Sequence, residues 1–289
     1  MFRVIKALNH NGVIAIDMDS QKQYILLGKG IGFGKKVNER MEVSEDTHIY
    51  LLQEKTDRGL TRELISNIDP KFLEIASSII MEAEKKFKKV DQNILFPLAD
   101  HIAFAVKRIK NNEEISNPLT EDIRALFSEE YDVACKARAI IQEVEGVDIT
   151  EDEIGYIALH IHSSLGNEKI SQAMNTVMLV RECITNIEQN VGKKIDIDSL
   201  SYNRLMTHIK YMVARTLKGE AINLDMNDYI KTRFEKSFKI SEDICTKLAN
   251  ELEKEIKDVE IGYLAMHIER IFTEELMESS ETWFSFKGD

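Results

Sequence analysis

The sequence predicts a multidomain protein, in which a small N-terminal antiparallel β-sheet domain is followed by two homologous all-α helical-bundle domains. Three observations carry this prediction. Short β-rich runs fill positions 1–53, and apolar residues recur at helical spacing from about position 60 onward. The phrase EIGYIALHI at 153–161 returns as EIGYLAMHI at 260–268. A length of 289 residues also favours two or three domains.

Four short runs predict the strands of the N-terminal sheet. FRVIKAL (2–8) and GVIAIDM (12–18) are joined by Asn-His-Asn-Gly, whose Asn and Gly residues suit a tight hairpin turn. QYILLG (23–28) and HIYLLQ (48–53) complete the set. So small a sheet buries little apolar surface, and dimerisation would therefore help to stabilise it.

A glycine-rich segment, GKGIGFGKK (28–36), lies between the third and fourth of these strands. It fits neither GxGxxG nor the Walker GxxxxGK[ST] pattern, which disfavours a nucleotide-phosphate loop. Phe33 stands among Lys29, Lys35 and Lys36. An aromatic ring among cations suits looped or single-stranded RNA, because bases stack on the ring and the amines meet phosphate. The alternative is a plain glycine-rich β-turn with solvated lysines.

Charge is distributed unevenly along the chain. Positions 1–40 hold seven Lys/Arg and three Asp/Glu, a net charge of +4, whereas the whole chain carries −12 and the remainder therefore −16. This balance argues against the whole chain binding nucleic acid. A basic head on an acidic body instead indicates two separate functions.

The sequence predicts a cytoplasmic protein. No run approaches the roughly 20 apolar residues of a membrane span, and charged residues interrupt the N-terminus, which makes it a poor signal peptide. The three cysteines, Cys135, Cys183 and Cys245, are scattered and form no CxxC motif, as is typical of reduced intracellular thiols.

The helical part is a duplication. The shift that carries position 153 to position 260 superposes the two EIGY phrases, and the same shift lays DHIAFAVKR (100–108) on THIKYMVAR (207–215). Cys135 matches Cys245 only at a slightly larger shift, which predicts compensated length changes between these anchors. We therefore expect three domains, over 1–57, 66–168 and 172–280, with a polar joint at 54–59 and a boundary near 163–169.

Helical geometry places the histidines of these segments. At 100° per residue, the apolar stripe of each helix points inward, and His101, His160, His208 and His267 all fall on the flanks of their stripes. His101 and His160 are separated by the same interval along the chain as His208 and His267. Thr150 followed by Glu153 is a capping-box pair that predicts the start of the first EIGY helix.

A flanking histidine has an ordinary explanation, as a polar residue at the border of a helix. Four histidines at paired spacings also suit another role. A neutral, accessible imidazole can accept a phosphoryl group near pH 7, and the added charge, on the order of −2, can change packing between domains or subunits. Metal binding is the chemical rival, prompted by His160 and His162, but helical positions i and i+2 point about 200° apart and cannot share one ion.

The head LNHNG…GKGIGFGKK, followed by two histidine-bearing helical repeats, resembles the BglG/SacY-type PTS-regulated transcriptional antiterminators over essentially the whole chain. The resemblance implies a dimeric co-antiterminator (CAT) RNA-binding domain and two PTS regulation domains. It also implies binding to an antiterminator hairpin in leader mRNA, which stops the overlapping terminator from forming. The implied partners are the phosphocarrier HPr and a sugar-specific PTS permease (enzyme II). DHIAFAVKR inclines the resemblance toward the glucose-responsive branch.

Carried over by motif, the resemblance implies RNA contacts from the head and phosphorylation of the four histidines. The implied RNA-contacting residues are Asn11, Gly28, Lys29 and Phe33, with Asn9 and Lys6 as further candidates. The implied phosphorylation sites are His101, His160, His208 and His267. Many relatives have arginine where Lys29 stands, and lysine lacks the planar fork needed for a bidentate contact. His162 has no counterpart in the second repeat, where Glu269 stands.

We therefore expect a regulator that needs no cofactor or metal and is not an enzyme. One alternative is a PTS-regulated DNA-binding activator with the same regulation domains, which would require a helix-turn-helix head. A metal-dependent hydrolase is the alternative from another class.

Overall fold

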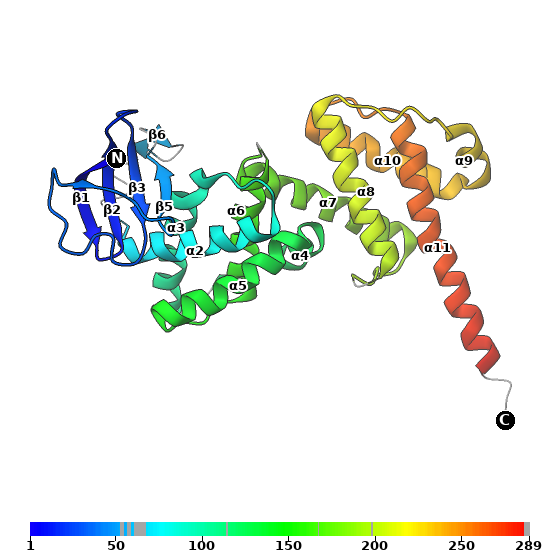
Figure 1. Cartoon of the computed structure of the whole chain (residues 1–289). Helices are drawn as coiled ribbons and strands as arrows, with labels where there is room; N and C mark the ends of the chain where they lie inside the picture. The colour runs from blue at the N-terminus through cyan, green and yellow to red at the C-terminus, as the bar shows by residue number, and fades with distance from the viewer. Residues whose placement is uncertain are drawn as a thin grey trace. The chain divides into compact units, whose positions relative to one another are not determined.

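The computed structural model describes residues 1–52, 55–56, 59–60, 68–113, 115–166, 168–197 and 199–285. The chain divides into two compact units, Met1–Ala173 and Met174–Asp289 (Figure 1). The first unit contains a β-sheet and a set of helices, and the second is helical. Within the described residues, no helix has the length and apolar character required to span a membrane.

The N-terminal sheet contains β1 (Phe2–Asn9), β2 (Gly12–Asp17), β3 (Gln23–Leu27), β4 (Arg40–Met41) and β5 (His48–Leu51). Their order is β4-β1-β2-β3-β5, and all neighbours are antiparallel. The four predicted strands are confirmed. Sequence periodicity missed β4, because so short a strand cannot show an alternating pattern.

Both faces of this sheet bury apolar side chains. On one face, a cluster forms from Val4, Val13, Ala15, Leu26 and Met41. Ile14 and Ile25 pair on the opposite face and are also buried. There the Tyr50 hydroxyl lies 2.6 Å from the Ser77 hydroxyl of the neighbouring helix α2 (Pro70–Lys86). The sheet and α2 therefore share a buried polar contact within the first unit.

Of the polar joint expected at 54–59, residues 54, 57 and 58 lie outside the described residues. β6 (Lys55–Thr56) and β7 (Gly59–Leu60) form a small antiparallel pair. Helix α2 then begins at an N-cap, where the Asp69 carboxylate accepts a hydrogen bond from the Lys71 amide at 3.1 Å and Pro70 occupies the first helical position.

The remaining helices of the first unit follow in short steps: η1 (Gln92–Ile94), α3 (Leu95–Lys110), α4 (Thr120–Leu126), α5 (Ser128–Glu145) and α6 (Glu151–Leu165). Helix α7 (Ile170–Val191) runs through the division between the units. The second unit adds α8 (Leu200–Lys218), α9 (Asn227–Arg233), α10 (Glu235–Leu252) and α11 (Val259–Ser285).

The duplication is visible in the helix boundaries. The shift that superposes the two EIGY phrases carries both ends of α4 onto the ends of α9, and both ends of α5 onto the ends of α10. The compensated length change inferred from Cys135 and Cys245 is therefore wrong. These cysteines are not structural equivalents, since Cys135 is exposed on α5 and Cys245 is buried on α10.

Candidate functional sites

The turn between β1 and β2 is held against the glycine-rich loop. The side-chain oxygen of Asn11 accepts a hydrogen bond from the Gly30 amide at 2.9 Å, and the Asn11 carbonyl accepts one from the Gly28 amide at 2.9 Å. The Asn9 side-chain oxygen accepts a hydrogen bond from the Asn11 amide at 2.8 Å. Two of the predicted RNA-contacting residues, Asn11 and Gly28, are thus directly bonded to each other.

The same loop approaches the turn too closely for any residue but glycine at position 32. The Gly32 amide donates to the His10 carbonyl at 2.9 Å, and a Cβ at Gly32 would lie only 2.1 Å from the Asn9 carbonyl oxygen. Phe33 follows and is 70% exposed. Its ring meets His10 edge-on, with the centroids 5.3 Å apart. An exposed ring fixed beside a rigid turn can stack on an unpaired base.

The cations around the loop differ in availability. Lys6 on β1 and Lys29 in the loop are exposed. Lys35, in contrast, forms an ion pair with Glu39 at 2.6 Å, and this contact lowers the pKa of the Glu39 carboxyl. Part of the positive charge that the sequence places near Phe33 is therefore balanced within the loop itself.

Both candidate asparagines also contact α2. The Glu74 carboxylate accepts hydrogen bonds from the side-chain Nδ2 of Asn9 at 2.6 Å and from the side-chain Nδ2 of Asn11 at 3.0 Å. Glu74 belongs to the helical part of the first unit. Sequence periodicity did not single it out, because an isolated glutamate on a helix carries no pattern.

The first histidine pair joins α3 to α6. The rings of His101 and His160 have their centroids 5.2 Å apart. Between the helices, the buried Glu153 carboxylate lies 2.6 Å from Arg108 Nη2 through Oε1 and 3.2 Å from His101 Nε2 through Oε2. The latter distance suits an ionic contact, although the ring N–H direction falls outside usual hydrogen-bond geometry.

The two histidines of this pair differ in burial. The His101 side chain is 16% exposed, whereas His160 is only 4% exposed and ranks among the buried polar residues. The prediction that all four histidines flank their cores is therefore wrong for His160. Helix α6 is covered by α5 on one side and approached by α3 and α4 on others, so its buried sector is wider than a single apolar stripe indicates.

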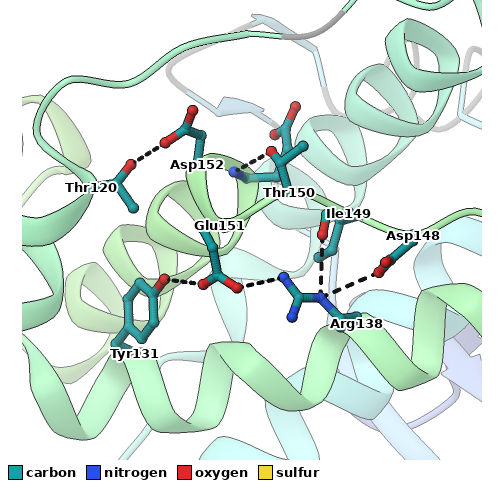
Figure 2. Close-up of polar contacts among 9 residues, drawn as sticks. Thr120, Tyr131, Arg138, Asp148, Ile149, Thr150, Glu151 and Asp152 are labelled. Carbon is teal, nitrogen blue, oxygen red and sulfur yellow. Dashed lines mark hydrogen bonds and ion pairs between the residues drawn. The ribbon is translucent and has the colours of Figure 1, made fainter.

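Three consecutive acidic residues fix the first turn of α6, and Figure 2 shows the contacts of two of them, Glu151 and Asp152. Glu151 binds the Tyr131 hydroxyl at 2.6 Å and Arg138 at 2.7 Å, both from α5. Asp152 accepts a hydrogen bond from Thr120 at the start of α4. Glu153 reaches α3. The first turn of α6 is thereby tied to three helices, which sets the position of the histidine pair.

The capping-box prediction holds only in part. The Thr150 hydroxyl accepts a hydrogen bond from the Glu153 amide at 3.4 Å, as an N-cap should (Figure 2). The Glu153 side chain does not return to the cap, because Arg108 and His101 bind it instead. A charged partner outcompetes a neutral backbone amide for a buried carboxylate.

The second histidine pair joins α8 to α11 with a different arrangement. The rings of His208 and His267 have their centroids 4.8 Å apart and are stacked. Arg215 holds both oxygens of Glu260, at 2.7 Å through Nε and 2.8 Å through Nη2. His208 Nε2 lies 3.9 Å from Glu260 Oε2. The same four residue types recur, but the arginine takes both carboxylate oxygens.

Electrostatics follow this arrangement. Burial raises the pKa of Glu153, but the contacts with His101 and Arg108 outweigh it and leave the pKa below its ordinary value. Burial, with added repulsion from His267 and Arg215, lowers the pKa of His208 to about 3. Burial and nearby arginines also lower the pKa of His267. His208 and His267 are therefore neutral near pH 7, the form in which imidazole is a nucleophile.

The second pair is reached through an open pocket in the second unit. The pocket has a volume of about 410 Å³ and is lined by Leu200, Asn203, Arg204, Thr207, His208 and His267. Both predicted acceptors thus face one solvent-connected space that also contains a cation and two hydrogen-bonding side chains.

Four residues of the histidine sites were not predicted as site residues. Glu153, expected only as part of a capping box, and Glu260 are the first letters of the repeated phrase, and Arg108 and Arg215 end the second matched segment. All four are matched at the same shift as the histidines. Their recurrence at that shift was the signal that could have identified them.

His162 has a structural rather than a ligating environment. Its ring lies 4.0 Å from the Phe127 ring centre to centre, and its nitrogens contact Glu130 at 2.8 Å and Glu168 at 3.3 Å. Over the described part of the chain, no group of three or more His, Cys, Asp or Glu side chains is arranged to hold a metal ion.

Comparison with known proteins agrees with this architecture. Residues 2–59 match the model of the CAT RNA-binding domain, and residues 74–164 and 181–271 each match the PRD domain. The head is therefore that of an RNA-binding protein, and the helix-turn-helix alternative is wrong.

Known relatives extend over nearly the whole chain. The GlcA/glcB genes antiterminator of Staphylococcus carnosus (strain TM300) is 33% identical over 91% of this chain and 93% of its own length. Transcription antiterminator LicT of Bacillus subtilis (strain 168) is 27% identical over 93% of this chain and 98% of its own length. The crystal structure of GlcT CAT-PRDI superposes with a TM-score of 0.51 and 35% identity, over 57% of this chain and 99% of that one. Such proteins are RNA-binding regulators and not enzymes. The chain belongs to the family of transcriptional antiterminators that combine a CAT RNA-binding domain with two PRD domains, on the branch that includes the GlcT proteins.

Proposed function

We propose that this protein is a sugar-responsive antiterminator that binds, as a homodimer, an antiterminator hairpin in a leader mRNA. Binding keeps the overlapping terminator from forming and lets the operon downstream be transcribed. The relatives of the GlcT branch favour glucose uptake as the regulated process. The protein would act in the cytoplasm, where leader transcripts and PTS phosphocarriers meet.

The RNA would contact the turn of β1–β2 and the loop after β3. Phe33 would supply an exposed ring for a base. The side-chain Nδ2 groups of Asn9 and Asn11 and the backbone at Gly28 would supply hydrogen bonds to the RNA. Lys29 and Lys6 supply positive charge for phosphates. The hydrogen bonds that hold the loop against the turn support this assignment, because a preformed surface loses little entropy on binding.

The four histidines His101, His160, His208 and His267 would accept phosphoryl groups, one pair in each PRD domain. HPr and the sugar-specific permease would be the donors. The observation that carries this part is the recurrence, in both domains, of two contacting imidazole rings beside a buried glutamate and arginine. Each added phosphoryl group would bring negative charge next to the glutamate–arginine ion pair of its domain. This charge would change the contacts of the pair and therefore the packing of the helices.

The RNA assignment is tested with the full-length chain and the antiterminator hairpin of its leader. Phe33→Ala should weaken binding by about 1–3 kcal/mol, the usual contribution of one stacked base. Val37→Ala is the matched control, because Val37 is also an exposed apolar residue near this loop, at 65% exposure. Equal binding by wild type and Phe33→Ala would contradict the role of Phe33.

The phosphorylation assignment is tested by labelling the full-length chain with phosphoenolpyruvate, enzyme I and HPr, and then repeating the reaction with a permease as donor. Single His→Ala variants at the four positions should each remove part of the label. Undiminished label in all four variants would exclude these histidines as the acceptors.

A further inference from the structure

One ring nitrogen of the first histidine is closed off in both PRD domains. His101 Nε2 and Glu153 Oε2 are shielded from solvent and lie 3.2 Å apart. His208 Nε2 is likewise shielded and lies 3.9 Å from Glu260 Oε2. A donor protein cannot bring a phosphoryl group to a nitrogen that solvent itself does not reach.

In the first domain, Glu153 also selects a tautomer of His101. The ionised carboxylate repels a lone pair on the facing Nε2 atom, so it favours the imidazole form whose proton is on Nε2. In that form the lone pair is on Nδ1. Resting on the proposed phosphorylation, we propose that the phosphoryl group enters His101 and His208 at Nδ1, and that Glu153 is a positioning residue for this transfer in the first domain.

The transfer balances without a further reactant. The Nδ1 lone pair of His101 attacks the phosphorus of the donor's phosphohistidine, and the donor's N–P bond breaks with its electron pair left on the donor nitrogen. The Nε2 proton stays on His101, whose ring becomes positively charged. Glu153, 3.2 Å away, offsets this charge, as a carboxylate does for the imidazolium of a Ser-His-Asp triad.

The regiochemistry is measured on the intact chain. In the unphosphorylated protein with ¹⁵N-labelled histidine, the nitrogen shifts of His101 should report the Nε2–H tautomer. After labelling, ¹⁵N–³¹P correlation should place phosphorus on Nδ1 of His101 and His208, with His101→Ala and His208→Ala used to assign the signals. A phosphorus signal on Nε2 of either residue, or an Nδ1–H tautomer of His101, overturns the proposal.

The role of Glu153 is measured with Glu153→Gln, which keeps the shape but loses the charge. His101 should then be labelled at least about tenfold more slowly and lose its dominant Nε2–H tautomer, while Glu153→Asp restores part of the rate. Glu121→Gln, an exposed change of the same charge in α4, should label at the wild-type rate. Equal rates in wild type and Glu153→Gln overturn the positioning role. A wild-type chain that takes no label contradicts the proposed function. In that case the ¹⁵N shifts of unphosphorylated His101 still test whether its proton is on Nε2.

A second, independent observation concerns the RNA surface. The side-chain Nδ2 groups of Asn9 and Asn11 both donate to the Glu74 carboxylate. Their side-chain oxygens are already used, because they accept hydrogen bonds from the backbone N–H of Asn11 and of Gly30 respectively. A carboxylate that accepts two amide hydrogen bonds occupies the place where an acceptor of the RNA, such as a phosphate oxygen, would bind.

We infer that Glu74 is an intramolecular competitor for RNA. The inference rests on the proposed RNA contacts of the two asparagines. RNA must replace both hydrogen bonds and tolerate a nearby negative charge, so the helical part of the first unit weakens RNA binding in the resting chain. The competitor is a single side chain of α2.

Full-length Glu74→Ala should bind the antiterminator hairpin about fivefold to tenfold more tightly than wild type, which corresponds to two hydrogen bonds that no longer have to be replaced. Glu129→Gln, an exposed charge change in α5, should alter affinity by less than about twofold. Unchanged or weaker binding by Glu74→Ala overturns the inference. If neither wild type nor Glu74→Ala binds any candidate hairpin, the proposed function itself fails.

Discussion

The two histidine sites contain the same residue types but differ in how the glutamate contacts the arginine and the histidine. In the first PRD domain, Glu153 divides its oxygens between Arg108 and His101. In the second, Arg215 takes both oxygens of Glu260, and His208 stands 3.9 Å away. A duplicated site can therefore diverge through the way in which one guanidinium contacts its carboxylate, without any change of residue type.

The divergence bears on the proposed phosphorylation. His101 already has a carboxylate in place to balance a charged ring, whereas His208 acquires one only if Arg215 releases an oxygen of Glu260. Under the proposed phosphorylation, the second domain would couple the charge of its histidine to a buried ion pair. Three predictions test differences between the two domains.

The largest effect is expected from removing the glutamates. Glu260→Ala leaves the largely buried Arg215 without its partner and should lower the free energy of unfolding by about 3–5 kcal/mol. Glu153→Ala should cost about 1 kcal/mol less, because Arg108 also lies over the Phe104 ring at 4.8 Å and loses only one direct hydrogen bond. Chemical denaturation followed by circular dichroism measures both variants. A larger loss in Glu153→Ala would reverse the comparison.

An intermediate effect is expected from acid. The pKa of His208 is about 3 in the folded chain and roughly 6.5 in the unfolded one, so the unfolded state binds a proton first as pH falls. Stability is therefore complete above about pH 6.5 and decreases toward pH 3, by at most roughly 1.4 kcal/mol per pH unit. His267, whose pKa is also lowered, changes stability in the same direction.

This acid effect is measured by urea denaturation of wild type and His208→Gln at about pH 7 and about pH 5.5. Wild type should lose roughly 1 to 1.5 kcal/mol more than the variant. Equal losses of stability in wild type and His208→Gln would show that protonation of His208 does not cause the loss of stability in acid.

The smallest effect concerns the glycine that the repeated phrase shares. A Cβ at Gly262 would lie 2.4 Å from Asn227 Oδ1, which accepts a hydrogen bond from the Gly262 amide at 3.1 Å. Gly262→Ala should therefore cost about 1 kcal/mol. At Gly155 the nearest atom is 3.7 Å away, and Gly155→Ala should stabilise its helix by about 0.5–1 kcal/mol. Thermal denaturation of the two variants should show shifts of opposite sign.

Most of the architecture could be predicted from the sequence. The strands of the head, the duplicated helices and the four histidines follow from alternation, helical spacing and one fixed shift between the repeats, all of which can be read from the order of the residues. β4 could not be predicted, because so short a strand carries no period. The match between Cys135 and Cys245 misled, since one repeated letter does not determine an alignment.

The candidate sites could be predicted less completely. The resemblance identified the turn, the loop and the histidines. In the structure, Asn11 is hydrogen-bonded to Gly28 and Gly30, so that the turn and the loop form one surface. The partners of these residues did not follow. Glu74 reaches Asn11 from far along the chain, and Glu153 reaches Arg108 from a different helix. Contacts at such separations depend on how helices pack, which periodicity does not encode.

The sequence by itself determined that the protein has a β-sheet head, two sister helical domains and a histidine pair in each, because hydrogen-bonding geometry and apolar periodicity act over a few residues. Only the tertiary structure decided which histidine is buried, how each glutamate divides its oxygens and where Glu74 lies. These outcomes depend on small differences in distance between side chains of different helices. At a contact between buried charges, such differences change the interaction enough to separate two otherwise equivalent sites.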